Sequence, residues 1–434
     1  MKEKLAVFWF RRDLRLHDNV GLFKALKSGY KVLPVFIFDT RILDNLEKDD
    51  ARVSFIYQSL QQIQEELRQN GSSLAIYHGI PKEVIKQLIN EFPIASVYTN
   101  QDYEPYARQR DSDIEKLLDS YRISFHTFKD QVIFEKDEIV KKDGSPYVVY
   151  SPYMRLWKEK FRHTRIEIFE TKPYYKNFLQ NKDLPNLELN DLGFIPSVIK
   201  TPPYNVEPSI LMYYQATRNY PAQDSTSHLG PHLRFGTVSI REIVQLAAVE
   251  KNETFLQELI WREFFMQILY HFPHTVTAAF KPKYDRIKWR NNEEEFELWK
   301  TGRTGFPLVD AGMRQLNSTG FMHNRVRMLV ASFLCKHLLI DWRWGEAYFA
   351  EKLLDYELSS NIGNWQWAAG SGVDAAPYFR IFNPITQIND YDKDLEYIKK
   401  WVEEYGTPEY PEMMVDHKDS RERALQVYKE AVNE

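Results

Sequence analysis

The chain has 434 residues, which is enough for a large core, and at about 150 residues per domain this length predicts two or three domains. Its net charge of −4 signals no general attraction to nucleic acid, so any such site must be local. The single cysteine, Cys335, excludes an internal disulfide, a zinc site built on several cysteines and a cysteine-ligated iron–sulfur cluster. No apolar run approaches the roughly 18 residues that span a bilayer. The start MKEKLAVFWF shows no secretory cleavage site, and we therefore expect a cytoplasmic protein without membrane insertion.

The N-terminal part alternates short apolar runs with helical patterns, beginning with LAVFWF, VGLFKALK and VLPVFIF. Apolar runs without polar alternation are typical of strands that are covered on both faces, as in a parallel sheet. The pattern predicts a doubly wound α/β domain over residues 1–130. A dinucleotide-type G-x-G-x-x-G turn is missing after the first run, where RRDLRLHDN stands instead. We expect its arginines to pair with a neighbouring domain.

The rest of the chain divides into a connector and a helical region. Residues 131–207 are rich in Pro, Tyr, Asn and Lys and show no sustained period, which predicts a connector. Residues 208–434 carry helical patterns such as ETFLQELIWREFFMQILYHF, which predict an all-α domain. Seven of the ten tryptophans lie between Trp261 and Trp367. For any one of them taken alone, a packed aromatic core is the simpler explanation.

Two short motifs could bind a ligand, although each has a plainer explanation. Residues 226–231 read TSHLGP before a helical stretch, an arrangement that suits a phosphate but more often only caps a helix. Glu258, Trp261 and Arg262 share one face of a predicted helix because of their i, i+3 and i+4 spacing. They could hold a planar polar ligand, or form a surface ion pair beside a packed indole.

Charged and amide side chains are concentrated further along the chain. Arg327 could pair with Asp355, while Asn361 could offer its amide to the edge of a heteroaromatic ring. Five cations between Lys281 and Arg290 could neutralise DNA phosphates. Such runs usually form a solvated face, however, and the acidic EEEFE that follows weakens this patch.

Several segments together resemble one family. They are TSHLGPHLRFG, ELIWREFF, TGFPLVDAGMRQL, TGFMHNRVRM, LLIDWRWGE, NIGNWQWAAGSGVDAAPYFRIFNP and the N-terminal FWFRRDLRLHDN. In this order and at this spacing they closely resemble the photolyase/cryptochrome family over almost the whole chain. The resemblance implies an N-terminal α/β antenna domain, a linker, and a C-terminal helical domain that holds FAD beneath an opening for DNA.

The resemblance also implies the residues around the flavin. Asn361 matches the position facing flavin N5, where photolyases usually carry Asn and cryptochromes carry Asp or Cys. Gly230 replaces a common serine, Glu357 replaces the usual Asp, and Phe321 replaces the usual Trp before the MHN motif. The residues implied in FAD binding are Tyr214, Thr226, Ser227, His228, Leu229, Gly230, Arg262, Asn324, Arg327, Asp355, Glu357 and Asn361.

Two sets of tryptophans match different roles in the family. Trp365, Trp342 and Trp289 match a relay that passes electrons between the flavin and the surface. Trp261 and Trp367 match the walls of the slot for a flipped-out pyrimidine dimer, a role in which stacking on the extruded base is required. The substrate is indicated by the catalytic positions Glu258, Asn324 and Met328, since enzymes that repair (6-4) photoproducts carry two histidines at the last two.

The resemblance extends to DNA and to an antenna. The implied DNA-contacting residues are Arg218, Trp261, Arg325, Trp367, Arg380 and Gln387. An antenna groove, for a deazaflavin or a folate, is implied at Phe36, Asp39, Arg52, Asp102 and Glu104.

The sequence thus predicts a cyclobutane pyrimidine dimer photolyase, in which light drives electron transfer from reduced FAD to the dimer and back. We expect it to act on damaged DNA as a monomer. A cryptochrome-like blue-light receptor without repair is the alternative. A DNA-binding flavoprotein without light chemistry is a third hypothesis, but it would leave the tryptophan relay without a purpose.

Overall fold

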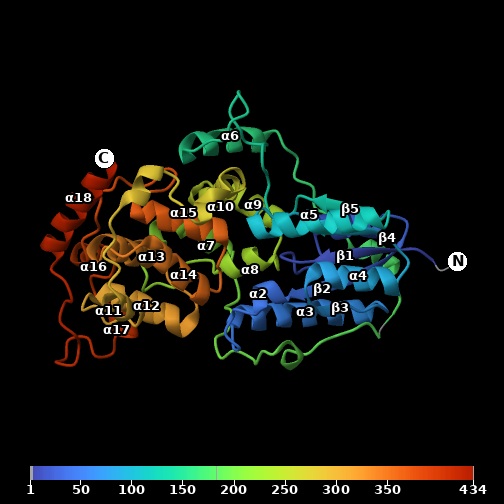
Figure 1. The fold of residues 1–434 in the computed structure, drawn as a ribbon, viewed down its shortest axis with the longest axis horizontal. Helices are drawn as coiled ribbons and strands as arrows, with labels where there is room; N and C mark the ends of the chain where they lie inside the picture. Colours follow the sequence, from blue (N-terminus) through green and yellow to red (C-terminus); the bar gives the residue numbers. More distant parts are fainter. Residues whose placement is uncertain (1–2, 182, 434) are drawn as a thin grey trace. The chain divides into compact units, whose positions relative to one another are not determined.

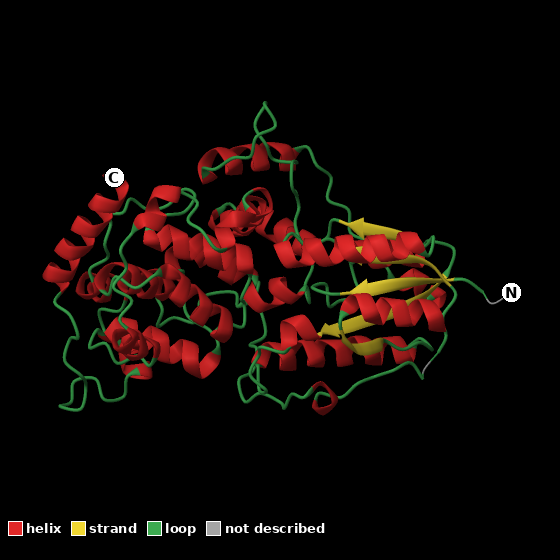
Figure 2. Cartoon of the chain, in the orientation of Figure 1, coloured by secondary structure: helices red, strands yellow, loops and turns green. Residues whose placement is uncertain are grey.

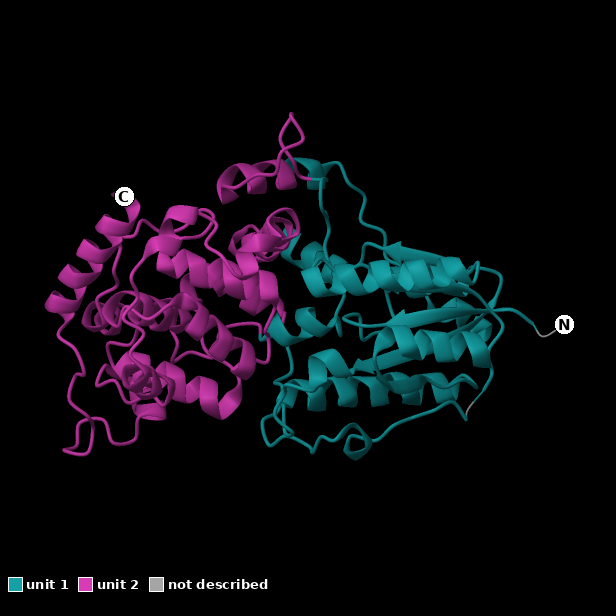
Figure 3. Cartoon of the chain, viewed as in Figure 1, with its two compact units in different colours: residues 1–138, 159–204, 228–249 teal, residues 139–158, 205–227, 250–434 magenta. Residues whose placement is uncertain are grey.

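The computed structural model describes residues 3–181 and 183–433, which form two compact units (Figure 3). Neither unit is one continuous stretch of chain. The first unit comprises residues 1–138, 159–204 and 228–249. The second comprises residues 139–158, 205–227 and 250–434. The stretch 131–207, expected as a connector, is shared between the units, and residues 228–249, expected in the helical domain, belong to the first.

The first unit contains a five-stranded parallel sheet with the order β3-β2-β1-β4-β5, drawn in yellow in Figure 2. Alternate residues of β1 face two different cores, since Phe8 and Phe10 pack in one apolar cluster and Val7 and Trp9 in another. The prediction of a doubly wound α/β domain is therefore confirmed. The strands are β1 (Leu5–Phe10), β2 (Lys31–Asp39), β3 (Ala75–Gly79), β4 (Ile94–Asn100) and β5 (Ser124–Phe128).

Helices pack along this sheet, and later segments of the chain add further helices to the first unit. Asn19 begins the first of them, because its side chain accepts a hydrogen bond from the backbone N–H of Leu22. The helices along the sheet are α1 (Val20–Leu26), α2 (Thr40–Leu43), α3 (Ala51–Gln69), α4 (Pro81–Glu91) and α5 (Pro105–Ser120). Later segments add the short helices η1 (Lys172–Asn177) and η2 (Asn190–Leu192), then α8 (Leu229–Phe235) and α9 (Ile240–Ala248).

Buried ion pairs explain why residues 228–249 belong to the first unit. The Arg241 side chain is buried and donates to Asp18 Oδ2 at 2.8 Å and to Asp130 Oδ1 at 2.9 Å. Arg15 donates to the other oxygen of Asp130 at 2.8 Å and to the backbone oxygen of Gly236 at 3.0 Å. The arginine-rich segment after β1 therefore forms its ion pairs inside the first unit.

The second unit is almost entirely helical, as the sequence predicts (Figure 1). Its helices up to the middle of the unit are α7 (Pro208–Thr217), α10 (Thr254–His271), η3 (Pro273–Val276), η4 (Pro282–Arg286), α11 (Glu293–Lys300), α12 (Pro307–Thr319) and α13 (Asn324–Ser332). The π-helical turn η5 (Phe333–His337) follows, then α14 (Trp342–Lys352), α15 (Leu358–Ala369), α16 (Pro384–Tyr391), α17 (Glu396–Trp401) and α18 (His417–Asn433). Residues of α6 (Tyr150–Arg162) are divided between the two units.

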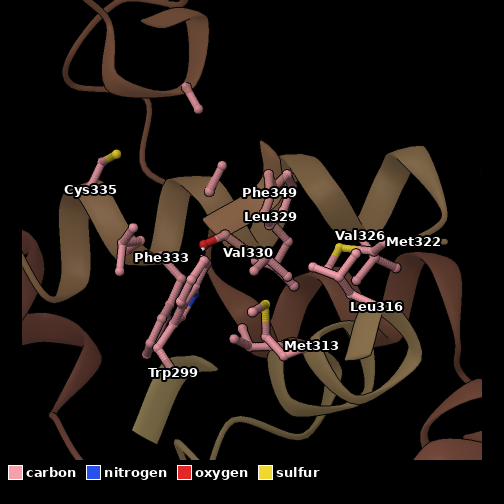
Figure 4. Packing of buried hydrophobic residues seen from close by; sticks show 14 of the residues in the cluster. Trp299, Met313, Leu316, Met322, Val326, Leu329, Val330, Phe333, Cys335 and Phe349 are labelled. Carbon is pink, nitrogen blue, oxygen red and sulfur yellow. Dashed lines mark hydrogen bonds between the residues drawn. The ribbon is translucent and has the colours of Figure 1, made fainter. Parts of the chain in front are cut away.

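One large apolar cluster forms the core of the second unit. Trp299 is fully buried in it, and its indole N–H donates to the backbone oxygen of Val330 at 3.3 Å (Figure 4). Cys335 is buried there as well, as expected of a structural thiol. Among the described residues, no helix has both the length and the apolar character needed to cross a bilayer.

Candidate functional site

A pocket lies among α13, α14 and α15 of the second unit. It brings together residues from three parts of the sequence, because α13 and α15 pack on each other and α14 packs on α15. Phe349 and Leu353 add apolar walls. The residues singled out by sequence that line this pocket are Asn324, Arg327, Met328, Asp355, Glu357, Asn361, Trp365 and Trp367.

Arg327 and Asp355 form a two-pronged ion pair in the pocket wall. The two terminal nitrogens of Arg327 donate to the two carboxylate oxygens of Asp355 at 3.1 and 2.9 Å. The remaining nitrogen of Arg327, Nε, donates to the backbone oxygen of Met322 at 2.7 Å, which fixes the plane of the guanidinium group. The predicted pairing of these residues is present in the structure.

Glu346 determines how Asn361 presents its amide. The Asn361 side-chain nitrogen donates to the backbone oxygen of Glu346 at 3.1 Å and to its Oε1 at 3.0 Å. Both partners are acceptors, so the amide nitrogen must face them and the amide oxygen is left for the pocket. The sequence reasoning missed Glu346. The available signal was its position four residues after Trp342, on the same face of α14 as that buried tryptophan.

The pH dependence of stability provides a test of this partly buried carboxyl. Burial raises the pKa of Glu346, although the hydrogen bond from Asn361 opposes the shift. An acid with a raised pKa in the folded state costs stability as the pH rises through that pKa, because the unfolded chain ionises more readily. We therefore expect Glu346→Gln to be more stable than the unmodified chain at about pH 8, and this advantage to shrink towards about pH 4.

Urea midpoints at the two pH values measure this difference. The exposed Glu351 on the same helix provides the control, since Glu351→Gln should show no such pH-dependent advantage. An equal stability change for Glu346→Gln at both pH values would contradict the assignment.

The three relay tryptophans belong to one aromatic region. Trp365 and Trp342 are buried in the core cluster, and Trp289 packs against it while remaining partly exposed. Gly345 is required by the close approach of Trp365, since a Cβ at this position would lie 2.1 Å from the indole ring. Trp365 also contacts Trp299, with ring centroids 6.2 Å apart. Trp365 and Trp342 are equally buried and Trp289 is the most exposed of the three, and their role as a relay stays a prediction.

Glu258 and Arg218 form an ion pair that the sequence reasoning did not foresee. Arg218, expected to contact DNA, donates to Glu258 Oε1 at 2.5 Å. Both side chains are partly exposed, so solvent weakens the pair. Trp261, on the same helix as Glu258, stacks on Tyr150 with ring centroids 3.6 Å apart and planes 8° apart. Tyr150 comes from the stretch expected as a connector, which gave no reason to place it here.

The other residues expected to contact DNA differ in exposure. Arg380 is exposed, with its guanidinium 5.7 Å from the ring of Phe382. Arg325 lies 4.4 Å over the ring of Tyr391 and donates to a side-chain oxygen of Asn219 at 2.7 Å. Gln387 is only 9% exposed on α16.

The remaining flavin positions lie outside the pocket wall. Tyr214 on α7 packs edge-on against Phe255, with ring centroids 5.1 Å apart, and Arg262 lies on α10. Thr226 and Ser227 end a segment of the second unit, and the chain then enters the first unit. His228 has a left-handed backbone with φ of 51°, and Leu229 and Gly230 begin α8.

The residues matched to an antenna groove are engaged within the first unit. Phe36 is buried on β2, Asp39 caps α2 and accepts from the Tyr106 hydroxyl, and Arg52 pairs with Asp50. Arg12 donates to both of the remaining carboxylates, to Asp102 at 3.2 Å and to Glu104 at 3.0 Å. Burial alone would raise the pKa of Asp102, but Arg12 and Arg11 hold it well below its usual value.

Two family models match the chain. The model described as DNA photolyase matches residues 6–173, and the FAD binding domain of DNA photolyase matches residues 255–408. The chain belongs to the DNA photolyase family. The resemblance inferred from the sequence motifs is thereby confirmed.

Individual photolyases are similar to this chain over nearly its full length. A deoxyribodipyrimidine photo-lyase of Halobacterium salinarum is 35% identical, over 98% of this chain and 99% of its own. The structure of a class III photolyase from Agrobacterium tumefaciens superimposes with a TM-score of 0.88 at 31% identity, covering 100% of this chain and 99% of its own. A Sulfolobus tokodaii photolyase solved with two FAD molecules gives 0.83 at 36% identity, covering 98% and 100%.

The pocket fits the isoalloxazine of FAD by the chemistry of its lining. Among the described residues, no hydrogen bond uses the amide oxygen of Asn361, which is therefore available to an N–H group of a ligand. The paired Arg327 and Asp355 supply donors and acceptors for a polar edge, and Phe349 and Trp365 supply apolar faces. These groups match a flat heterocycle whose edges are polar.

Proposed function

We propose that this photolyase repairs cyclobutane pyrimidine dimers in DNA in a light-dependent reaction, as a cytoplasmic monomer with reduced FAD as its cofactor. The observation that carries the proposal is one pocket that joins a flavin-compatible wall to Asn324, Met328 and Trp367. Similar proteins named deoxyribodipyrimidine photo-lyase favour repair over a receptor role.

Arg327, Asp355, Glu357 and Asn361 would hold the flavin ring. Its phosphates and ribityl chain would be bound by the remaining residues matched to FAD, which are Tyr214, Thr226, Ser227, His228, Leu229, Gly230 and Arg262. When bound and reduced, FAD supplies the light-excited electron that opens the cyclobutane ring. Asn361 contributes its amide oxygen as an acceptor whose direction is fixed by Glu346.

The dimer would lie against Asn324 and Met328, between the indoles of Trp261 and Trp367. An extruded dimer exposes apolar faces and carbonyl edges, which stacking rings and a neutral amide accommodate without a competing charge. Glu258 would direct its carboxyl to the dimer edge, and the ion pair with Arg218 positions that carboxyl. In this proposal Arg218 therefore has two roles: it positions the catalytic carboxyl of Glu258, and it contacts DNA.

The surrounding cations would bind the DNA backbone. Arg380 and Arg325 are suited to phosphate contacts, which position a duplex without reading its sequence. We also propose a light-harvesting chromophore, a deazaflavin or a folate, in the first unit near Phe36 and Asp39. The carboxylates Asp102 and Glu104 would act there through Arg12.

The decisive experiment measures dimers in ultraviolet-treated DNA before and after blue light, with purified protein whose FAD is already reduced. We expect dimers to disappear in light and to persist in a dark sample. Persistence of dimers in light, with full FAD occupancy, would refute the repair function.

The relay provides a separate prediction. Trp289→Phe replaces an oxidisable indole at the partly exposed end of the relay by a ring that is far harder to oxidise. We expect photoreduction of oxidised FAD to slow at least about tenfold, which corresponds to a rise of about 1.4 kcal/mol in the activation barrier. Repair by previously reduced protein should be unchanged.

Transient absorption and a repair assay measure the two quantities separately. Trp401→Phe is the control, since Trp401 packs against the same core cluster but lies outside the proposed relay. Equal losses in photoreduction and repair would show that Trp289 serves the fold rather than electron transfer.

A further inference from the structure

Lys336 is a cation inside the core of the second unit. It lies on the π-helical turn η5, an irregular turn that often marks functional positions, and its side chain is 1% exposed. Its Nζ donates to the backbone oxygen of Ala369 at 2.9 Å and to that of Tyr378 at 3.3 Å. Ala369 is the last residue of α15, where backbone carbonyls lack partners within the helix. Lys336 thus ties the end of α15 to the segment that follows it.

No carboxylate pairs with Lys336 among the described residues, and its charge faces rings and carbonyls. Its ammonium lies 3.6 Å from the ring centroid of Tyr428, an attractive cation–π contact. Burial lowers the pKa of Lys336 to about 7 and raises the pKa values of Cys335 and Tyr428, so these two neighbours are neutral. The titratable groups around Lys336 and its neighbours lie on several elements: Cys335 and His337 on its own turn, Tyr378 on the following segment, Tyr428 and Arg423 on α18, and Tyr284 and Asp341, which act on Cys335 or Tyr428.

The segment that Lys336 holds carries exposed side chains. Residues 370–383, here called the 370–383 loop, connect α15 to α16 and include Phe379, which is 61% exposed, and the exposed Arg380. The loop follows directly after Trp367 and Ala368, which line the pocket. Lys336 therefore links Ala369, the residue after the pocket-lining Ala368, to Tyr378, which directly precedes the exposed Phe379 and Arg380.

We propose that Lys336 is a positioning residue for DNA binding, which holds the 370–383 loop against the end of α15 so that Phe379 and Arg380 are presented beside the pocket. This inference rests on the proposed function, since it assumes that damaged DNA binds at this face. A buried cation without an anionic partner costs stability, and an apolar side chain of similar size would pack at lower cost. Against this cost, the charged side chain makes its two hydrogen bonds to the backbone oxygens of Ala369 and Tyr378.

The substitution Lys336→Met tests this role, because it keeps an unbranched side chain that is only one atom shorter and removes the two hydrogen bonds. We expect the variant to remain folded and to be at least as heat-stable as the unmodified protein. Its affinity for dimer-containing DNA should fall roughly tenfold, the effect of losing two charge-assisted hydrogen bonds. The repair yield at saturating DNA should not change, since the hydrogen bonds and the ring contact of Lys336 go to Ala369, Tyr378 and Tyr428, which are not among the residues proposed to act on the dimer.

Lys429→Met is the matched control, since Lys429 is exposed on α18 next to Tyr428. It removes the same charge from the protein surface and should leave the affinity nearly unchanged at moderate salt. Equal affinities of Lys336→Met and the control would overturn the inference, as would a loss of affinity that accompanies a loss of heat stability. If the unmodified protein neither binds nor repairs dimer-containing DNA, the proposed function fails instead.

The pH gives a second measurement on the unmodified protein. Charge-assisted hydrogen bonds weaken when Lys336 loses its proton, so the affinity ratio of the unmodified protein to Lys336→Met should shrink between about pH 6 and about pH 8.5. Hydrogen exchange in the 370–383 loop of the unmodified protein should rise over the same interval beyond its intrinsic pH dependence. This hydrogen-exchange measurement tests the inference even if the variant does not fold, because it uses the unmodified protein. A loop equally protected from exchange at both pH values, after correction for the intrinsic pH dependence, would overturn the inference.

Discussion

Replacing Arg241 with methionine is expected to lower the free energy of unfolding of the first unit by about 3–5 kcal/mol. Arg241 is the cation between Asp18 and Asp130, and both of these carboxylates are buried. Methionine fills part of the space but leaves Asp18 buried with no cation and Asp130 with Arg15 alone. An uncompensated buried charge is far more costly than the loss of one hydrogen bond.

Hydrogen exchange of the β1 amides at increasing denaturant measures this loss in the first unit. Arg68→Met on α3 is the control, since Arg68 is exposed and its replacement should change stability by less than about 0.5 kcal/mol. A loss below about 1 kcal/mol for Arg241→Met would show that water reaches the two carboxylates. In that case the buried network would not explain why residues 228–249 fold with the sheet.

The second large effect concerns FAD binding. Arg327→Ala is expected to raise the Kd for FAD roughly 10–100-fold, since truncating one partner of a hydrogen-bonded charge pair costs about 2–5 kcal/mol when fully buried. The lower part of this energy range applies to the pair of Arg327 and Asp355, because solvent reaches their side chains, which are 24% and 18% exposed. Asp355 would remain in the pocket wall without its cation, which would further disfavour an electron-rich flavin.

Titration of the FAD-free protein with FAD, followed by flavin fluorescence, measures this change. Arg421→Ala on α18 removes an exposed arginine from the same unit and should leave the Kd as it was. An unchanged Kd in Arg327→Ala would mean that the flavin does not depend on this wall of the pocket.

Much of the fold follows from local pattern. The apolar strands of the first unit and the amphipathic helices of the second could be recognised from the sequence. The spacing of apolar residues, which indicates the buried face of an element, is a property of residues that are close in sequence. Motifs such as TGFMHNRVRM and NIGNWQWAAG identified the family, and eight of the proposed site residues do share one pocket.

The parts that sequence reasoning missed depend on distant contacts. Glu346 orients Asn361 across two helices, Arg218 meets Glu258 across 40 positions, and Tyr150 covers Trp261 from outside the predicted helical domain. No local period marks such partners, because each becomes a neighbour only when its helix packs. The same holds for Arg241, whose position in α9 gives no sign of Asp18.

By itself, the sequence determined the α/β and helical character of the chain, its membership of the photolyase family and the side chains available for flavin and dimer. Only the tertiary structure decided which residues make up each compact unit, which atom of the Asn361 amide faces the pocket, and that Lys336 lies buried beneath the 370–383 loop. The physical reason is that composition and period fix which faces must be buried. The partners of a buried charge or amide are fixed only by the packing that brings distant segments together.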